Sequence, residues 1–340
     1  MRVLLIKLTS MGDLIHALPA LSDAQAAIPS IQFDWVIDEN FAEIASWHPA
    51  VNIIIKSAHR RWRRHYKKHW PEIRGFVKQL RKTHYDLIID GQSNLKSALV
   101  TLFSKGLKCG FDKNSVREYP AHWVYKKQLA HSKQDHAITR IRSLFSQALA
   151  YPLPTTPPDF GLDRALFKAP KLPLPKRYLM FIHNASWNTK LWPEDYWQQL
   201  MVFCLATNLT ILLPAGNSEE LARSNRLAHN HPQIIALPRL PLSEIAFLLS
   251  HAIATVSVDT GLSHLSAALN IPTITLYGAT DAELIGATGL HQVHLQSRFA
   301  CAPCYLHKCN YTQISPVQPA CFTELTPQLV WQTLQTLLPL

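Results

Sequence analysis

The sequence predicts an α/β fold with two Rossmann-like domains that face a central cleft. Short apolar runs that are typical of buried strands alternate with amphipathic helical segments along most of the chain. Continuous apolar strands of this kind form parallel sheets that helices cover on both faces. A proline-rich segment interrupts the alternation near the middle of the 340 residues. Two domains of about 150 to 170 residues each are the natural expectation for such a length.

The first half of the chain begins with the apolar run 2–7, RVLLIK, which is predicted to be a buried strand. Leucines with helical spacing predict a helix from Asp13 up to Pro29. Seven prolines between residues 152 and 175 exclude regular elements there. We therefore expect an N-terminal domain at 1–160 and a linker at 161–177. Further strands are predicted at 33–37, 51–55 and 85–90, and further helices around 70–82 and 134–150.

The alternation restarts after the linker and predicts a second sheet of the same kind. We expect a C-terminal domain at 178–322, followed by a C-terminal helical segment at 323–340. Ligands of open α/β sheets bind outside the carboxyl ends of the strands, so polar residues that follow strands are candidates for a site. Strands are predicted at 178–183, 209–213, 234–237, 254–258 and 272–277, and helices at 194–205, 218–229, 242–250, from Gly261 onward and near 326–338.

The composition predicts a cytoplasmic protein with an anionic partner. No uncharged apolar run reaches the roughly 18 residues that a membrane-spanning helix needs. The first residues lack the long apolar region and the cleavage site of a signal peptide. The formal charge of +11 indicates nucleic acid, phospholipid or a phosphorylated substrate as the partner.

The turn after the first strand, Thr9–Asp13, carries the first candidate for chemistry. Gly12 permits a tight turn, and Asp13 follows it at the start of a helix. One interpretation is that Asp13 caps this helix by accepting backbone N–H groups. The other is that its carboxylate faces the cleft as a general base.

Two turns in the second half favour a phosphate group. Segment 183–194, HNASWNTKLWPE, offers a hydroxyl and a lysine beside a helix start, although a solvated surface loop would have the same composition. His183 ends an apolar strand and is interpreted as a structural histidine. Segment 257–264, SVDTGLSH, opens a helix whose N-terminal amides favour an anion, and Asp259 and Thr260 could also be a plain capping pair. Neither the G-x-G-x-x-G nor the P-loop fingerprint occurs.

Six segments together identify a family by their motifs and their order. Segment 257–264 is followed by LYGATD at 276–281, and the chain begins with KLTSMGDLIHALPAL at 7–21. Further motifs are YDLIID at 85–90 with Lys96-Ser97, SVRE at 115–118 and K-x-W-P-E at 190–194. These motifs resemble those of the bacterial lipopolysaccharide heptosyltransferases and span most of both halves. The MGD-x-x-H-x-LPAL form of the first motif is closer to heptosyltransferase I than to heptosyltransferase II.

The resemblance implies a GT-B glycosyltransferase with an acceptor-binding N-terminal domain and a nucleotide-sugar-binding C-terminal domain. Such an enzyme moves L-glycero-D-manno-heptose from ADP-heptose to the inner Kdo of Kdo-lipid A, with inversion, in lipopolysaccharide core biosynthesis. By resemblance, Asp13 is the general base that deprotonates the acceptor hydroxyl. Ala185 stands where a second hydroxyl residue is expected. The implied donor contacts are Ser186 and Lys190 on the diphosphate, Thr260, Gly261 and His264 on the phosphates, Asp259 near the sugar, and Glu220 on the ribose hydroxyls.

No metal or other cofactor is expected for this reaction. No D-x-D pair lies where a metal-dependent transferase would need it. A single inverting displacement needs one base and stabilisation of the leaving ADP, which Lys190 and helix N-terminal amides can supply. The cysteines Cys301, Cys304, Cys309 and Cys321 have a spacing that a structural zinc site could use, and ordinary cysteines without a metal remain the other interpretation.

The basic segment 56–68, KSAHRRWRRHYKK, is expected to contact the acceptor and the membrane surface. Anionic lipids attract clustered basic residues, and interleaved aromatic residues suit the same interface. A solvated helix face and nucleic-acid binding are the alternatives, and no nucleic acid partner is expected. The protein would then associate peripherally with the cytoplasmic face of the inner membrane. The expected acceptor contacts are Arg60, Arg61, Arg63, Arg64 and Arg117.

Two other functions remain open at this point. Within the enzyme class, the chain could be a heptosyltransferase II or another inverting GT-B transferase. Outside it, the chain could be a basic, nucleotide-binding module without activity that docks on membranes or nucleic acid. Asp13 distinguishes the classes, because a binding module has no use for a base.

Overall fold

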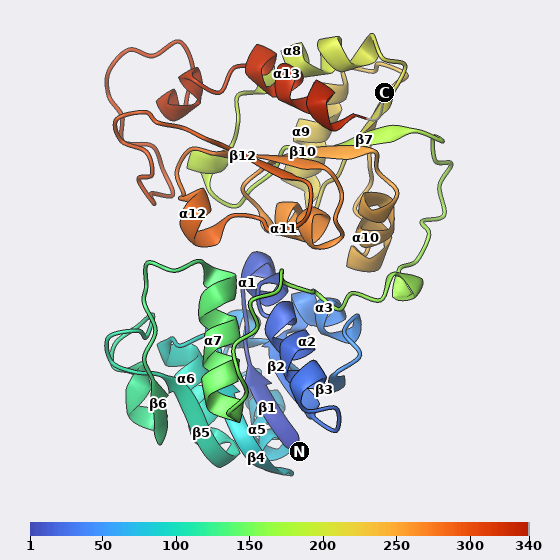
Figure 1. Cartoon of the computed structure of the whole chain (residues 1–340). Coiled ribbons are helices and arrows are strands. Elements are labelled where there is room, and N and C mark those ends of the chain that lie inside the picture. The colour runs from blue at the N-terminus through green and yellow to red at the C-terminus, as the bar shows by residue number, and fades with distance from the viewer. Residues whose placement is uncertain (339–340) are drawn as a thin grey trace. The chain divides into compact units, whose positions relative to one another are not determined.

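The computed structural model describes residues 1–338 and forms two compact units (Figure 1). The N-terminal unit is Met1–Asp163, and the C-terminal unit begins at Arg164. Each unit contains one six-stranded sheet, in which all neighbouring strands are parallel. The predicted α/β class, with two parallel sheets, is confirmed. Between residues 152 and 177 the chain has no strand, and its one helical turn is the 3₁₀ helix η3 (Arg164–Leu166).

The sheet of the N-terminal unit has the strand order β3-β2-β1-β4-β5-β6. This is the order of a doubly wound Rossmann sheet, and the direction of winding reverses between β1 and β4. Ligands bind at the carboxyl ends of the two strands that flank such a reversal. The strands are β1 (Arg2–Ile6), β2 (Gln32–Asp38), β3 (Val51–Ser57), β4 (His84–Asp90), β5 (Lys105–Phe111) and β6 (Lys127–Leu129).

One of the helices predicted for this unit differs in the structure. The single helix expected from Asp13 to Pro29 is two helices, α1 (Met11–Ile15) and α2 (Leu18–Ala27). Pro19 lies in the first turn of α2, where its missing N–H costs nothing, whereas inside one continuous helix it would break the backbone ladder. The remaining helices are α3 (Ala42–Ser46), α4 (His59–Arg64), α5 (Trp70–Leu80), α6 (Leu95–Phe103) and α7 (Ala137–Leu149), with 3₁₀ helices η1 (Glu39–Phe41) and η2 (Ala121–Val124).

The sheet of the C-terminal unit repeats the same winding. Its order is β12-β11-β10-β7-β8-β9, so the reversal lies between β7 and β10. The strands are β7 (Tyr178–Ile182), β8 (Thr210–Leu213), β9 (Ile234–Ala236), β10 (Ala254–Val258), β11 (Thr273–Tyr277) and β12 (Gln292–Gln296). The helices are α8 (Glu194–Leu205), α9 (Ser218–Ala228), α10 (Leu242–Ser250), α11 (Gly261–Ala268), α12 (Ala282–Ile285) and α13 (Pro327–Leu337), with 3₁₀ helices η4 (Asn188–Lys190) and η5 (Ala320–Thr323).

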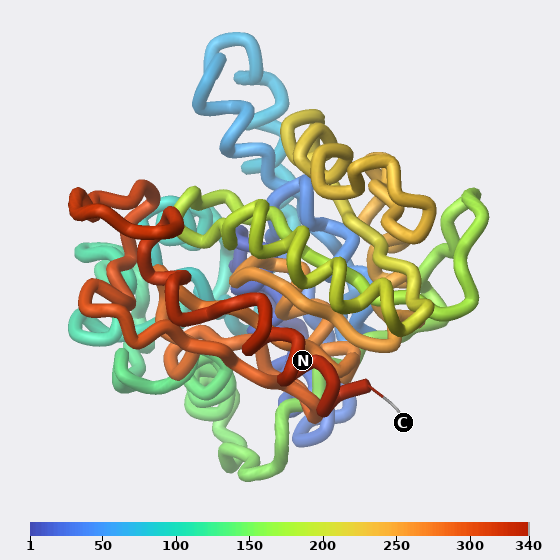
Figure 2. The backbone as a smooth tube through the Cα atoms, turned by 90° about the horizontal axis from the view of Figure 1, so that it is seen from above, coloured from blue at the N-terminus to red at the C-terminus, as the bar shows by residue number. Residues whose placement is uncertain are grey.

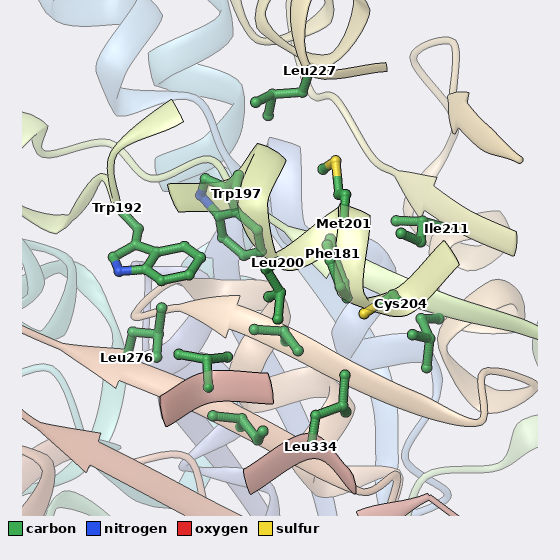
Figure 3. Packing of buried hydrophobic residues seen from close by; sticks show 14 of the residues in the cluster. Phe181, Trp192, Trp197, Leu200, Met201, Cys204, Ile211, Leu227, Leu276 and Leu334 are labelled. Atoms are coloured by element: carbon green, nitrogen blue, oxygen red, sulfur yellow. The ribbon is translucent and has the colours of Figure 1, made fainter. Parts of the chain in front are cut away.

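The core of the C-terminal unit is rich in aromatic residues (Figure 3). Trp192 and Trp197 are fully buried, and their rings meet edge to face with centroids 5.0 Å apart. Phe181 of β7 packs on Trp197, and α13 adds Leu334 to the same cluster. Aromatic side chains bury the largest areas in a core, so this cluster anchors the segment that follows β7 and ends at α8.

The helices of the described chain include none that is long and apolar enough to span a lipid bilayer.

In the N-terminal unit, the light-blue segment that holds α4 and α5 extends outward from the rest of the unit (Figure 2).

Candidate active site

Asp13 lies at the winding reversal of the N-terminal sheet, in the first turn of α1 directly after β1. The N-cap of α1 is Ser10, and Asp13 is the N3 residue of the same capping box, so its carboxylate has the capping role considered from the sequence. The backbone N–H and the hydroxyl of Ser10 donate to Asp13 Oδ2 at 2.8 and 3.1 Å. These bonds hold one oxygen of the carboxylate, while the side chain keeps 29% of its surface exposed. The carboxylate is therefore both fixed and accessible.

Two cations flank this carboxylate. Lys7 Nζ lies 4.0 Å from Asp13 Oδ1, and Arg117 Nη1 lies 3.9 Å from Asp13 Oδ2. Burial by itself would raise the pKa of Asp13, but the charges of Lys7 and Arg117 and the bonds from Ser10 lower it below its usual value. Burial lowers the pKa of Lys7, against the attraction of Asp13. Asp13 is thus ionised at neutral pH, the state in which it can accept a proton.

The loop that follows β4 positions both cations. Lys7 Nζ donates to the carbonyl of Gly91 at 2.8 Å, and the side chain of Gln92 accepts from the backbone of Leu8 at 3.0 Å. The carbonyl of Ser93 accepts from the backbone N–H of Arg117 at 3.1 Å. The loops after β1 and β4 are thereby joined, and the segment that carries Arg117 is tied to them.

Asp90 organises the base of this loop from inside the sheet. It is fully buried, and it accepts the Tyr125 hydroxyl at 2.7 Å and the backbone N–H groups of Gln92 and Ser93 at 2.9 and 2.8 Å. Burial raises the pKa of Asp90 against these hydrogen bonds. A Cβ at Gly110 would lie 2.5 Å from the ring of Tyr125, so glycine is needed there for Tyr125 to reach Asp90.

Asp259 lies at the winding reversal of the C-terminal sheet, directly after β10. Its Oδ2 accepts from Lys190 Nζ at 2.6 Å and from the Thr280 hydroxyl at 2.6 Å, and its Oδ1 lies 3.6 Å from His264 Nε2. Burial would raise the pKa of Asp259, but His264 and Lys190 hold it well below its usual range. Lys190 comes from η4 after β7, so the loops of both strands at the reversal meet here.

The N-terminus of α11 adds backbone donors next to this cluster. Thr260 is the N-cap of α11, and Gly261 is its first residue. The first amides of a helix have no partner within the helix and favour an anion. Lys190 Nζ also lies 4.5 Å from the ring centre of Trp187, and that ring stacks on His307 with centroids 4.1 Å apart. The cation is therefore held from two sides.

Two predicted donor residues have no hydrogen bond or ion pair to the Asp259 cluster in residues 1–338. Ser186 is exposed in the loop before η4. Glu220 lies in the first turn of α9, where its carboxylate accepts from the backbone of Gly216 at 2.7 Å and from the side chain of Asn217 at 2.8 Å. His183 is buried beside Ser224 at 3.0 Å, and burial lowers its pKa to about 3. His183 thus has the environment of a structural histidine.

In the predicted basic patch, some arginines form ion pairs within the unit and others do not. Arg61 bridges Glu39 at 3.0 Å and Glu72 at 2.7 Å, and its hydrogen bonds lower the pKa of Glu72 to about 2. Arg60 lies 3.6 Å from Asp38. Arg63 and Arg64 are exposed on α4 and form no ion pair with the described part of the chain. Arg63 and Arg64 can therefore meet an anionic partner without breaking an ion pair, and Arg117 is also exposed.

The cysteines are all free thiols. Cys321 is buried, and burial raises its pKa to about 12, whereas Cys301 and Cys309 are exposed. No cluster of three or more potential metal-ligating side chains occurs among residues 1–338. The expectation that the reaction needs no metal stays a prediction.

Sequence reasoning missed three residues that hold these groups in place: Lys7, Gln92 and Thr280. The sequence position of Lys7 could have indicated its role, because a lysine at the end of a buried apolar strand needs a carbonyl or carboxylate partner. Gln92 and Thr280 follow strands of the sheets, and their partners lie 83 or 84 and 21 residues away in sequence. Spacing along the chain does not reveal such contacts.

Comparisons with known proteins show the family to which this chain is similar. Residues 73–315 match the family model described as glycosyltransferase family 9 (heptosyltransferase). Lipopolysaccharide heptosyltransferase 1 of Pseudomonas aeruginosa is 44% identical over 99% of this chain and 98% of its own length. The structure of E. coli heptosyltransferase WaaC with ADP superposes with a TM-score of 0.87 and 38% identity, covering 99% of this chain and all of that one. The same enzyme with ADP-2-deoxy-2-fluoro heptose gives a TM-score of 0.84 at 37% identity over 99% of both chains.

Proposed function

The chain belongs to glycosyltransferase family 9, the heptosyltransferases, and we propose that it transfers heptose from ADP-heptose to the inner Kdo of Kdo-lipid A. It is a glycosyltransferase with the function of a heptosyltransferase 1, since relatives with that name match nearly the whole chain. The observation that carries the donor and acceptor assignment is the pair of polar clusters, one at each winding reversal.

The C-terminal cluster supports a nucleotide-diphosphate donor. We propose that Lys190, together with Thr260 and Gly261 at the N-terminus of α11, binds the diphosphate, with Ser186 and His264 contributing hydrogen bonds. Asp259 would orient Lys190 and accept a sugar hydroxyl, and Glu220 would accept from the ribose through lone pairs that Gly216 and Asn217 leave free. Fixed donors aimed at the leaving ADP stabilise its charge in the transition state. No metal is required in this scheme.

The N-terminal cluster supports a general base. In an inverting transfer, the acceptor hydroxyl attacks the anomeric carbon as the bond to ADP breaks, and the hydroxyl proton passes to a base. We propose that Asp13 accepts this proton through Oδ1, since Ser10 occupies Oδ2. Arg117 would bind an acidic group of the acceptor next to that position.

The basic helix α4 supports a membrane-embedded, anionic acceptor. We propose that Arg63 and Arg64, with Arg60 and Arg61, contact the phosphates and carboxylates of the acceptor and the surrounding headgroups. The protein would act at the cytoplasmic face of the inner membrane as a peripheral protein, without nucleic acid as a partner. Each basic residue near an anionic membrane contributes about 1 kcal/mol to binding.

The experiment that tests this function compares two acceptors with ADP-heptose as donor. Heptose should pass to purified Kdo-lipid A, and an acceptor that already carries the first heptose should be inert. Product masses distinguish the outcomes. Transfer to the heptosylated acceptor alone would assign the second heptosyl transfer instead, and no transfer to either would reject the donor.

A further inference from the structure

Helix α5 of the N-terminal unit exposes an apolar face. Among its 11 residues only Leu80 is buried. Phe76 packs against the core and the ring of Trp62, whereas Ile73 and Val77 stay partly exposed. Trp70, at its start, leaves 55% of its surface exposed. An amphipathic helix normally buries its apolar residues against a core, so Trp70, Ile73 and Val77, which keep exposed surface, are suited to a partner outside the unit.

Helix α6 continues the same surface. It exposes Leu99 at 55% and Phe103 at 37%, and these two side chains line an open groove with Trp70, Ile73 and Val77 of α5. The groove has a volume of about 1180 Å³, more than the roughly 300–1,000 Å³ of ordinary small-molecule pockets. Large exposed apolar patches on soluble proteins mark sites of protein or membrane contact.

The 3₁₀ helix η2 packs against α6 and also carries an exposed aromatic side chain. Its Trp123 leaves 70% of its surface exposed and contacts the ring of Tyr119, which is 67% exposed. Tryptophan and tyrosine collect at membrane interfaces, where one end of the ring is apolar and the other is hydrated.

The rim of the groove is strongly basic. Arg74, Lys78, Arg81 and Lys82 lie along it. Between residues 56 and 108 the chain has 14 lysines and arginines and three acidic residues, Glu72, Asp86 and Asp90. Each of the three is engaged: Glu72 by Arg61, Asp86 by the backbone N–H of Arg2, and Asp90 inside the sheet. The free charge around the groove is therefore positive.

We propose that the groove between α5 and α6 is a docking surface for an anionic lipid bilayer, and that its apolar side chains enter the acyl boundary. Nucleic acid would match the positive charge but offers no apolar surface for the groove. A second copy of the chain would match the apolar groove but would bring its own basic rim into repulsion. An anionic bilayer matches both, as it does for amphipathic helices that lie in the interface. This inference rests on the proposed function only in that the acceptor is a lipid.

The test measures binding to unilamellar vesicles of equal parts phosphatidylglycerol and phosphatidylcholine, without acceptor or donor. The groove variant Trp70→Ser/Leu99→Ser/Phe103→Ser should lower the partition coefficient about tenfold or more. The control variant Val202→Ser/Leu290→Ser removes side chains that are 66% and 69% exposed in the C-terminal unit, and it should bind like the parent. Unchanged melting temperatures show that each variant is folded.

The salt dependence of vesicle binding distinguishes the apolar contribution of the groove from the electrostatic contribution of the arginines of α4. At about 0.5 M NaCl the charges are screened within a few ångströms, so the parent should retain residual binding through the groove, and the groove variant should retain none. Vesicle binding of the groove variant equal to that of the parent at both salt concentrations would overturn the proposal. So would a loss of self-association in sedimentation with unchanged vesicle binding, which would assign the groove to a second copy.

Activity on a water-soluble, deacylated acceptor tests the transferase function independently of membrane docking. The groove variant should turn over this acceptor like the parent and should be impaired only with the vesicle-embedded acceptor. Failure of the parent on both acceptors would reject the proposed function and leave the vesicle result standing.

Discussion

Lys190 and Asp259 form a 2.6 Å ion pair with little solvent exposure on either side chain. Asp259 also accepts from Thr280 and lies near His264, so the carboxylate stays compensated if one partner engages a ligand. Lys190 can therefore turn its remaining N–H bonds to a phosphate while Asp259 holds it in place.

Replacing Lys190 tests this arrangement. Lys190→Ala removes a charge-assisted contact of roughly 1.5 to 3 kcal/mol, which corresponds to about 10- to 150-fold weaker ADP binding. Calorimetry with ADP measures the change, and Lys176→Ala, an exposed lysine in the same unit, is the control. Equal ADP affinity in Lys190→Ala and the parent would remove Lys190 from the donor site.

Two buried histidines predict the pH dependence of stability. Burial lowers the pKa of His48 from 6.5 to about 4 and that of His183 from 6.5 to about 3. The Nδ1 atom of His48 accepts the backbone N–H of Ala50 at 3.1 Å, so a proton there would break that bond. Below pH 6.5 the unfolded chain binds protons at both histidines and the folded chain does not. The free energy of unfolding should therefore fall as the pH decreases from 6.5 towards 4.

Urea unfolding of variants between about pH 7 and pH 4.5 checks this slope. His48→Asn keeps an acceptor for Ala50 but has no proton to bind, so its stability should depend less on pH than that of the parent. His291→Asn, at an exposed histidine, is the control. An identical slope in His48→Asn and the parent would show that His48 does not titrate as described.

At the scale of residues, the sequence predicted the charged centres of the site better than their supports. Asp13, Lys190 and Asp259 each follow a predicted strand closely, and polar residues there are expected to bind ligands. Lys190 and Asp259 are 69 residues apart, and only the strand order brings them together. The role of Gln92 as the link between two loops likewise depends on β1 and β4 being neighbours.

At the scale of elements, the arginines of α4 have different roles. Arg61 connects α4 to η1 and α5 through ion pairs with Glu39 and Glu72. Arg63 and Arg64 are exposed and form no ion pair with residues 1–338. The double variant Arg63→Ser/Arg64→Ser should therefore raise the acceptor KM and weaken binding to anionic vesicles, with melting temperature and ADP affinity unchanged. The vesicle effect should shrink as salt is added.

Arg61→Ser is the matched comparison for this prediction. It should also disturb the position of α4, because two carboxylates lose their shared partner. Parental KM and vesicle binding in Arg63→Ser/Arg64→Ser would mean that this face of α4 is only solvated.

Regular elements were predictable where their residues follow one period without interruption. Helices α8 and α10 and strand β10 have the predicted bounds. Strands β5, β6 and β12 were not predicted. β5 contains two glycines and two lysines, β6 has three residues, and β12 is a polar, partly exposed edge strand. β6 and β12 are edge strands, and β5 lies between β4 and β6 next to the edge. Pairing with neighbouring strands stabilises such strands of weak intrinsic propensity.

At the scale of the molecule, one winding pattern occurs twice and places a polar cluster at each reversal. In the N-terminal unit the cluster is a carboxylate between two cations, and in the C-terminal unit it is a lysine held by a buried carboxylate. The first can accept a proton and the second can bind a diphosphate. We propose that the base lies in the N-terminal unit and the donor site in the C-terminal unit.

The Asp13→Asn variant tests that claim most directly. The asparagine side chain introduced there can still accept from Ser10 and preserve the first turn of α1, so the melting temperature and the ADP affinity should match those of the parent. Loss of a general base should lower kcat about 100- to 10,000-fold. Asp13→Ala should lose the same activity and, in addition, about 1 kcal/mol of stability with the bonds from Ser10. A kcat near that of the parent in Asp13→Asn would contradict the account, because Asp13 would then serve only the helix.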